Sequence, residues 1–362
     1  MRKEVKLGDI LDYEQPNSYI VRNSNYDKKF ATPVLTAGQS FILGYTNEKE
    51  NIFKAKENPV IIFDDFTTAS KYVDFDFKVK SSAMKILKPK EGINIKYVYY
   101  AMQNIKFDNQ LHKRYWISEY SKIKLLIPDI KIQEKIVKEL DLINKLINYK
   151  RKQEELLDDF IKSQFVEMFG EPLISNNYGR ITLDKLIKVS QGLQIPIEKR
   201  KNDKGRNRYK YITIQYLNGS KKEEYIENPN ERVICNKEDI LMTRTGNTGQ
   251  VITNVEGVFH NNFFKMDYDR KIINKEFLIK YFENELIYKD IIRRATTSTI
   301  PDLSHSQFYK MSIDLPPLEL QNQFSEIVKQ IDKQKFEIEK SLKETQELYE
   351  SLMDEYFEGE KR

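Results

Sequence analysis

Cysteine and histidine are both scarce in this chain of 362 residues, which contains one cysteine and three histidines. A single thiol cannot form an internal disulfide, and a cysteine-based zinc site needs several thiolates. His112, His260 and His305 are scattered without the spacing of metal ligands. No histidine lies beside Cys235 in sequence to activate it as a nucleophile. We therefore expect no metal site, no catalytic cysteine and a reducing, cytoplasmic location.

Long apolar runs and the common nucleotide-binding motifs are also missing. No stretch approaches the roughly 18 apolar residues of a membrane helix, and the N-terminus lacks the apolar region of a signal peptide. Neither the G-x-x-x-x-G-K-[ST] loop nor a G-x-G-x-x-G after a strand occurs. An Asn/Asp-Pro-Pro-aromatic loop, typical of amino-methyltransferases, is absent as well. The pair Asp64-Asp65 could hold Mg²⁺, but no well-spaced Glu-x-Lys partner follows. The sequence thus predicts no catalytic residue and no cofactor in this chain.

Charge is distributed in blocks, although the net charge is only +5. Residues 1–128 carry 21 basic and 15 acidic residues, whereas residues 129–170 carry 8 and 9. Residues 171–315 carry 24 and 19, and residues 316–362 carry 7 and 12. Two basic blocks therefore alternate with two neutral or acidic ones. This pattern favours two regions that face a polyanion, each followed by a region built for protein contact.

The two less basic blocks repeat each other. A shift of 188 aligns Pro128–Phe169 with Pro316–Phe357 without a gap, and Gln133 then meets Gln321. Apolar residues follow a 4-3 spacing in both, with polar interruptions at Lys150, Glu154 and Lys335. We expect two long helices of about 57 Å that pair with each other, since each helix gains about 1.5 Å per residue. The alternative is two unrelated surface helices, each packed on its own domain.

The two basic blocks correspond more loosely. Residues 5–7, 60–63 and 94–102 resemble residues 181–183, 239–242 and 274–282, at offsets of 176 to 180. We therefore predict an α+β fold made of two tandem-repeated globular domains, each followed by a long helix. The predicted boundaries are 1–128, 129–170, 171–315 and 316–362.

Basic residues gather at two places in the second globular domain. The segment 199-KRKNDKGRNRYK-210 has seven basic residues and one acid, and this composition suits contacts to phosphates. A solvated lysine-rich loop that contacts no phosphate would have the same composition. A second cluster follows a helix, where Arg293 and Arg294 precede four hydroxyl residues at 296–299. The candidate polyanion-binding residues here are Lys199, Arg200, Lys201, Arg206, Arg208, Arg293, Arg294, Thr297 and Ser298.

A strand followed by a hydroxyl-rich loop occurs in both domains. In 240-ILMTRTGNTGQVI-252 the loop carries Arg and Gln, side chains that read guanine and adenine edges. Gly246 and Gly249 allow positive φ in a tight hairpin, and a plain hairpin with exposed polar residues is the alternative. The counterpart after 60-VIIF-63 is DDFTTASKYV, which lacks glycine. The candidates in these loops are Thr67, Thr68, Ser70, Lys71, Arg244, Thr245, Asn247, Thr248 and Gln250.

The first domain also has a mixed basic and aromatic segment, 112-HKRYWISEY-120, after its own helix. Lys113 and Arg114 are candidates for phosphate contacts. Core packing is an equally good reading of Tyr115 and Trp116. Thr36, within 33-PVLTAGQSFILGYTNE-48, completes the set of candidate contacts.

The chain resembles the specificity subunits of type I restriction-modification systems over nearly all its length. The residues that carry the resemblance are 315-LPPLE-319 at the start of a long helix, the matching Ile127-Pro128, the loop ILMTRTGNTGQV, and the segments 33–48 and 61–77. The order of globule, helix, globule and helix is that of the family too. The first repeat departs from the family pattern in having Pro128-Asp129 where a double proline is usual.

This resemblance implies two target-recognition domains that each read half of a split sequence in double-stranded DNA. It also implies that the two helices pair as an antiparallel coiled coil that fixes the gap between the half-sites and docks methyltransferase subunits. Two such subunits and restriction subunits are the expected partners. They would use S-adenosylmethionine, ATP and Mg²⁺, while this chain would catalyse nothing.

Three alternatives stay open from the sequence. The first is an enzyme, either a nuclease or a methyltransferase, whose motif escapes notice. The second is a coiled-coil scaffold that binds no DNA. The third is a similar DNA-recognition subunit of another methylation or phage-defence system.

Overall fold

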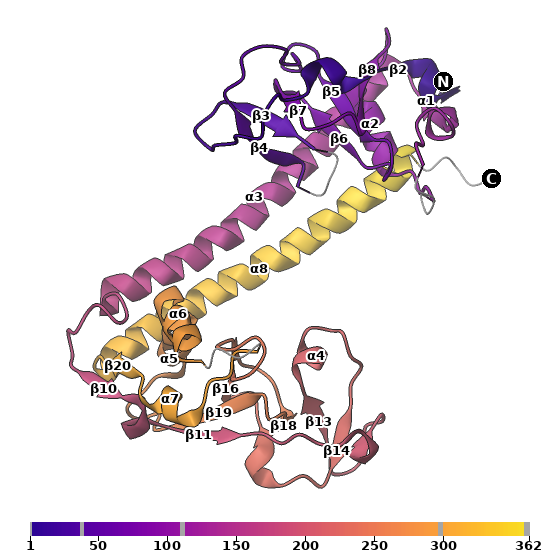
Figure 1. The fold of residues 1–362 in the computed structure, drawn as a ribbon. Helices are drawn as coiled ribbons and strands as arrows, with labels where there is room; N and C mark the ends of the chain where they lie inside the picture. Colours follow the sequence, from indigo (N-terminus) through magenta and orange to yellow (C-terminus); the bar gives the residue numbers. More distant parts are fainter. Residues whose placement is uncertain (1, 37–39, 109–112, 296–299, 358–362) are drawn as a thin grey trace. The chain divides into compact units, whose positions relative to one another are not determined.

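The computed structural model describes residues 2–36, 40–108, 113–295 and 300–357 (Figure 1). The chain divides into two compact units. Unit 1 comprises Met1–Arg151 and Lys340–Arg362, and unit 2 comprises Lys152–Glu339. The boundaries between the units lie inside the helices α3 (Ile130–Phe169) and α8 (Leu318–Phe357). Each long helix therefore belongs partly to unit 1 and partly to unit 2.

The ends of α3 have local causes in the sequence. Pro128 precedes the helix, and the carboxylate of Asp129 accepts a hydrogen bond from the Ile132 amide at 3.2 Å. At the other end Gly170 adopts φ +83°, and its amide donates to the Val166 carbonyl. This is the left-handed ending that glycine favours after a helix. Both 40-residue helices match the lengths predicted from the sequence.

Unit 1 contains an antiparallel four-stranded sheet in the order β2-β8-β5-β6, next to a three-stranded sheet β4-β3-β7 and a strand pair β1-β9. These strands are β1 (Lys3–Lys6), β2 (Leu11–Glu14), β3 (Thr32–Leu35), β4 (Ile42–Thr46), β5 (Val60–Asp64), β6 (Ser70–Val73), β7 (Lys78–Val79), β8 (Met84–Pro89) and β9 (Lys124–Ile127). The helices are α1 (Leu7–Ile10) and α2 (Ile95–Gln103), together with short 3-10 turns at Pro16–Tyr19 and Tyr120–Lys122.

Unit 2 repeats this plan with an antiparallel sheet β11-β19-β16-β17 and a strand pair β10-β20, and it adds a five-stranded sheet β12-β14-β13-β18-β15. Its strands are β10 (Arg180–Thr182), β11 (Ile187–Gln191), β12 (Arg200–Lys201), β13 (Arg208–Ile212), β14 (Tyr225–Glu227), β15 (Ile234–Cys235), β16 (Ile240–Thr243), β17 (Val251–Ile252), β18 (Gly257–Phe259), β19 (Phe263–Tyr268) and β20 (Ser312–Asp314). Its helices are α4 (Ile214–Leu217), α5 (Lys275–Glu283), α6 (Glu285–Arg294) and α7 (His305–Tyr309). The predicted tandem α+β fold is confirmed.

The central strands β5 and β16 explain why the sequence shows apolar runs there and no alternation. All five residues of β5 are buried, and its two faces enter different cores. Ile61 and Phe63 pack with α2, whereas Val60 and Ile62 face the core under β3 and β7. In β16, Ile240 and Met242 likewise face one core and Leu241 another. A strand covered on both sides reads as a continuous hydrophobic run.

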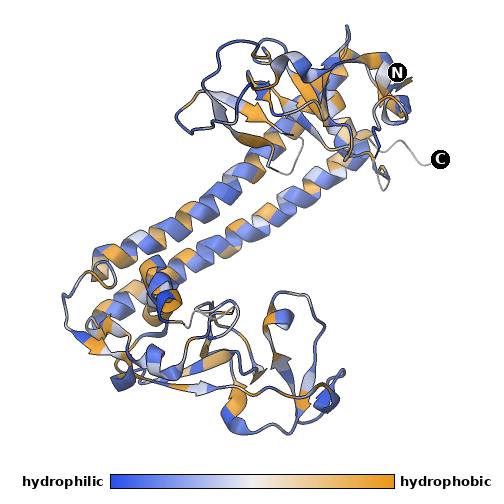
Figure 2. Cartoon of the chain, viewed as in Figure 1, coloured by the Kyte–Doolittle hydropathy of each residue, from blue (hydrophilic) through white to orange (hydrophobic). Residues whose placement is uncertain are grey.

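Within each unit, α3 and α8 pack on each other in antiparallel directions. In unit 1, Tyr356 bonds to Glu139, and Lys150 donates to Ser341 at 2.6 Å. In unit 2, Lys335 donates to Asp158 at 2.7 Å, and the rings of Phe165 and Phe324 lie 5.5 Å apart. Figure 2 shows apolar residues recurring among hydrophilic ones along both helices. Two of the predicted interruptions, Lys150 and Lys335, thus form polar bonds between the helices.

A buried glutamine ties each long helix to its sheet domain in the same way in both units. We call this set of hydrogen bonds the glutamine joint. The side chain of Gln133, 1% exposed, accepts from the Asn94 amide at 2.8 Å and donates to the Pro128 carbonyl at 2.9 Å. Gln321, fully buried, accepts from the Asn274 amide at 2.8 Å and donates to the Pro316 carbonyl at 2.7 Å. Asn94 and Asn274 in turn cap α2 and α5. The Gln133/Gln321 identity seen in the sequence is therefore a structural repeat.

Candidate nucleic-acid interface

The loop between β5 and β6 is held by the carboxylate of Asp64. Asp64 accepts from the Phe66 amide at 2.9 Å and from the Thr67 hydroxyl at 2.6 Å. Thr68 adopts φ +60°, the left-handed region that is uncommon for a branched residue. This loop therefore contains a positive φ without glycine, whereas the second hairpin has its positive φ values at Gly246 and Gly249, +89° and +91°.

Asp65 fastens the segment at 113–120 to this loop. Its carboxylate accepts from the Trp116 amide at 2.9 Å and pairs with Lys85 at 3.2 Å, and both side chains of that ion pair are at most 4% exposed. The Asp64-Asp65 pair that could have held Mg²⁺ is thus used to position backbone. Tyr115 and Trp116 are 1% and 2% exposed, so the core reading of these two rings is correct.

The predicted contacts of unit 1 differ in accessibility. Thr67, Lys71 and Arg114 are exposed, Thr36, Thr68 and Lys113 are half-buried, and Ser70 is buried at 8% exposure. The amine of Lys113 pairs with Glu119, which raises the pKa of the lysine. The Arg114 guanidinium lies 6.0 Å from the centre of the Phe66 ring. Loop β5–β6 and Arg114 therefore share one surface, while Thr36 follows β3 on a different sheet.

The hairpin between β16 and β17 is tied to the segment after α6. Arg244 pairs with Asp302 at 2.7 Å and stacks 5.5 Å from the Phe264 ring, and Thr245 also bonds to Asp302. Thr248 is 1% exposed and donates to the Pro301 carbonyl at 2.8 Å. Arg244 is 18% exposed at its side chain. Asn247 and Gln250 are the exposed members of the predicted set in this hairpin.

Packing around the hairpin accounts for its second glycine. A Cβ on Gly249 would meet Ile291 at 3.0 Å and Tyr288 at 3.3 Å, so the loop lies close against α6. His305 lies over the same Phe264 ring as Arg244, at 4.7 Å between ring centres. Burial and the nearby Arg244 charge both lower the pKa of His305. The neutral imidazole is therefore favoured beside this cation.

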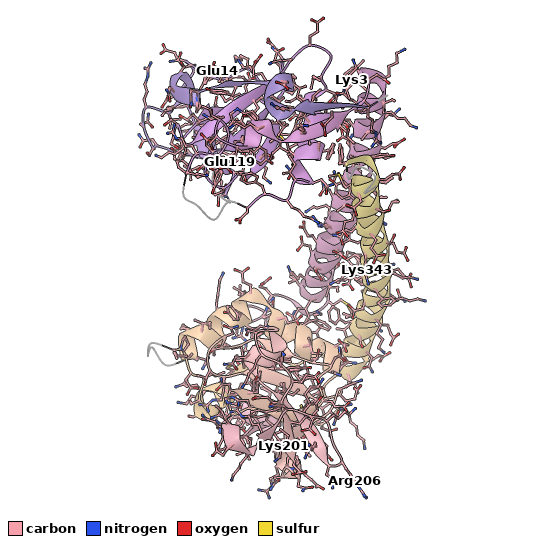
Figure 3. All side chains as sticks on the ribbon, turned by 90° about the vertical axis from the view of Figure 1, so that its right-hand side faces the viewer. Lys3, Glu14, Glu119, Lys201, Arg206 and Lys343 are labelled. Atoms are coloured by element: carbon pink, nitrogen blue, oxygen red, sulfur yellow. The ribbon has the colours of Figure 1, made fainter. Side chains whose placement is uncertain are left out.

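Some basic side chains of the segment 199–210 form ion pairs within unit 2, and others point to solvent. Arg200 pairs with Glu224 at 3.0 Å and donates to the Ile195 carbonyl, and Arg208 pairs with Asp203 at 2.6 Å. These two arginines stabilise the fold around β13 and β14. Lys199 and Arg206 are exposed, Lys201 is half-buried, and none of the three forms an ion pair with the residues that the structure describes. Arg206 points outward from the edge of unit 2 (Figure 3).

At the end of α6, Asp290 holds both predicted arginines. Asp290 is 4% exposed, and it bonds to Arg294 at 2.6 Å and to Arg293. Burial alone would raise the pKa of Asp290, but the two arginines lower it overall. The Arg293 side chain is 76% exposed and is the accessible charge of this pair. Thr297 and Ser298 lie outside the described residues.

Two residues that the sequence did not single out belong to these surfaces. Asp302 fixes Arg244 and Thr245, and Gln103 bonds to Ser70 at the end of α2. Neither stands in a motif, and each reaches the loop from a distant part of the chain. Their spacing in sequence, 58 and 33 residues from their partners, carries no periodic signal.

Comparisons with known proteins agree with this geometry. Residues 177–348 match the family model for the type I restriction modification DNA specificity domain. The chain is 47% identical over 165 residues to the EcoR124I/EcoR124II specificity subunit of Escherichia coli, covering 41% of each chain. It is 27% identical over 126 residues to the MjaVIII specificity subunit of Methanocaldococcus jannaschii, covering 34% of this chain and 29% of the relative. The matches thus span less than half the length of these curated relatives.

The fold likeness extends further than the sequence identity. The S subunit of a type I restriction-modification system from M. genitalium matches at a TM-score of 0.60 and 14% identity, covering 99% of this chain and 96% of that one. A second type I structure matches at 0.59 and 12% identity, covering 98% and 97%. Residues 177–348 therefore carry a type I restriction modification DNA specificity domain, and the solved S subunit structures share the fold over nearly the whole chain. The resemblance predicted from the sequence is confirmed.

No described group of three or more His, Cys, Asp or Glu side chains is placed to hold a metal ion. Among the described helices, none combines the length and the apolar character needed to cross a membrane.

Proposed function

We propose that this chain is the specificity subunit of a type I restriction-modification complex and reads a bipartite target in double-stranded DNA. The observation that carries the proposal is the repeated sheet order, β2-β8-β5-β6 and β11-β19-β16-β17. A hydroxyl-rich loop follows the corresponding strands β5 and β16. The specificity-domain match over residues 177–348 supports the same reading for the second repeat. Each unit then reads one half-site, and different loop side chains read different bases.

In this proposal α3 and α8 form an antiparallel coiled coil over their full length and set the gap between the half-sites. The antiparallel bonds in both units, Lys150–Ser341 and Lys335–Asp158, support that pairing. The helices also dock two adenine methyltransferase subunits, and restriction subunits join the larger complex. The partners use S-adenosylmethionine, ATP and Mg²⁺, whereas this chain binds DNA and catalyses nothing.

The test is a map of methylated adenines in a host that expresses this chain with its methyltransferase subunit and has no other type I system. The expected result is a split motif with a fixed gap. A continuous short motif, or no methylation above the host background, would overturn the proposal.

Two measurements on the purified chain separate the rival functions. A specificity subunit binds duplex DNA with an affinity that falls steeply with salt, because phosphate contacts release counterions. A coiled-coil scaffold would show no such binding. An enzyme would cleave or methylate DNA alone with Mg²⁺ or S-adenosylmethionine, and we expect neither activity.

A further inference from the structure

Gln103, the last residue of α2, borders the loop between β5 and β6. Its Nε2 donates to the Ser70 hydroxyl oxygen at 2.8 Å. Ser70 is 8% exposed, whereas Gln103 is exposed. Together with Thr67 and Thr68 they border a hollow of about 190 Å³ on the surface of unit 1. A side-chain amide therefore stands at the edge of a polar hollow, anchored from below by a buried hydroxyl.

The surroundings of this amide are rigid. Ser70 pairs with Phe63 across the β5–β6 ladder, and Phe63 is fully buried. The loop between them is fixed by Asp64, which accepts from the Phe66 amide and the Thr67 hydroxyl. A side chain locked by packing and hydrogen bonds loses little conformational entropy when a ligand binds. The hydroxyl that anchors the Gln103 amide therefore stands on a buried, hydrogen-bonded strand pair.

The two threonine hydroxyls beside the hollow already donate within the loop. The Thr67 hydroxyl donates to Asp64, and the Thr68 hydroxyl donates to the Thr67 carbonyl. The bond to Ser70 uses one N–H of Gln103. An amide has two N–H donors and a carbonyl acceptor, so the bond to Ser70 leaves one donor and the acceptor of this exposed side chain for a ligand. Gln103 is thus the exposed side-chain amide at this hollow, and an amide carries a donor and an acceptor side by side.

That pair of groups matches one base edge in the major groove. Adenine offers the N7 acceptor beside the N6 amino donor, and a glutamine or asparagine amide binds both. Guanine offers two acceptors there, which suit arginine or lysine. We propose that Gln103, oriented by Ser70, reads an adenine in the half-site recognised by unit 1. This inference rests on the proposed function and names the base class for one position.

The experiment uses the full chain with its methyltransferase subunit and compares methylation maps of the wild type and three variants. Gln103→Ala should lose the requirement for A at one position of one half-site, lowering discrimination there by about 5- to 150-fold. Gln103→Glu keeps the size but accepts hydrogen bonds only, so it should shift that position from A toward C, whose N4 amino group donates. The second half-site and the gap should not change in either variant.

The control is Gln153→Ala, an exposed glutamine on α3 in unit 2, which should leave the whole motif unchanged. An unaltered first half-site in both Gln103 variants would overturn the inference, as would relaxation at a position that is not an A·T pair. Either result, combined with a split wild-type motif, leaves the proposed function standing. A wild type without a split motif overturns both.

Discussion

Two lysines on β8 show how differently the same residue type acts in this protein. Lys85 is 1% exposed, pairs with the buried Asp65 and lies 4.6 Å from the centre of the Tyr13 ring. Lys88 is 44% exposed at its side chain and pairs with Glu14. Because the partner of Lys85 is itself buried, losing the lysine leaves a carboxylate without a counter-charge in the interior.

We expect Lys85→Ala to lower the free energy of unfolding of unit 1 by about 3–5 kcal/mol, the usual cost of breaking a buried ion pair. Lys88→Ala on the same strand should cost less than about 1 kcal/mol, because its pair is solvated. Urea unfolding followed by the fluorescence of Trp116 measures both, since this single tryptophan is buried in unit 1. Equal effects of the two substitutions would contradict the argument.

The basic segment of unit 2 gives a second contrast at the residue scale. Arg206→Ala should weaken DNA binding evenly across sequences. It should also reduce the slope of the logarithm of the binding constant against the logarithm of the salt concentration by about 1, as loss of one phosphate contact does. Arg200→Ala should instead destabilise unit 2, because its guanidinium bonds to Glu224 and the Ile195 carbonyl. Binding titrations at several salt concentrations, paired with thermal unfolding, distinguish the two. A change in stability with Arg206→Ala would assign Arg206 to the fold, and an unchanged salt dependence would exclude a phosphate contact.

At the scale of elements, the glutamine joints connect each long helix to a capped shorter helix. Gln321 bonds to the Asn274 amide, the Pro316 carbonyl and the Ile272 carbonyl, and it is fully buried. Gln133 makes the corresponding three bonds in unit 1. The joint therefore holds the start of each long helix against the N-terminal end of α2 or α5.

Gln321→Ala should lower the free energy of unfolding by about 1–3 kcal/mol, since the Asn274 amide loses its acceptor in a buried site. Gln323→Ala is the matched control, because Gln323 is exposed on the same helix. Denaturant unfolding followed by far-ultraviolet circular dichroism gives both values. A Gln321 variant as stable as the Gln323 variant would show that the joint contributes nothing to stability.

At the scale of the whole molecule, the proposed function assigns the gap between the half-sites to α3 and α8 and base recognition to the sheet domains. Seven residues inserted in both α3 and α8, after Arg151 and after Glu339, keep the heptad spacing and lengthen each helix by about 10 Å. At about 34 Å per ten base pairs, the gap in the methylated motif should grow by about three base pairs. The half-sites should stay the same. A change in the bases recognised would refute the separation of spacer and readers.

The sequence alone predicted the features that repeat along the chain. The two 40-residue helices followed from heptad spacing, the tandem α+β domains from similar offsets between matching segments, and the family resemblance from local motifs. These signals are local or periodic, so they survive without knowledge of the fold. The same reasoning assigned Arg200, Thr248 and Ser70 to DNA contact by residue type alone.

Only the tertiary structure decided which of these side chains are accessible. Arg200 turns to Glu224, Thr248 is buried against the Pro301 carbonyl, and Ser70 lies beneath Gln103. Each of these partners is brought in by chain folding, from 24, 53 and 33 residues away. Side-chain orientation depends on such distant contacts, because an arginine or a hydroxyl suits an internal hydrogen bond as well as a phosphate. The sequence therefore determined the architecture, and the packing of remote segments determined which of the candidate side chains stay accessible.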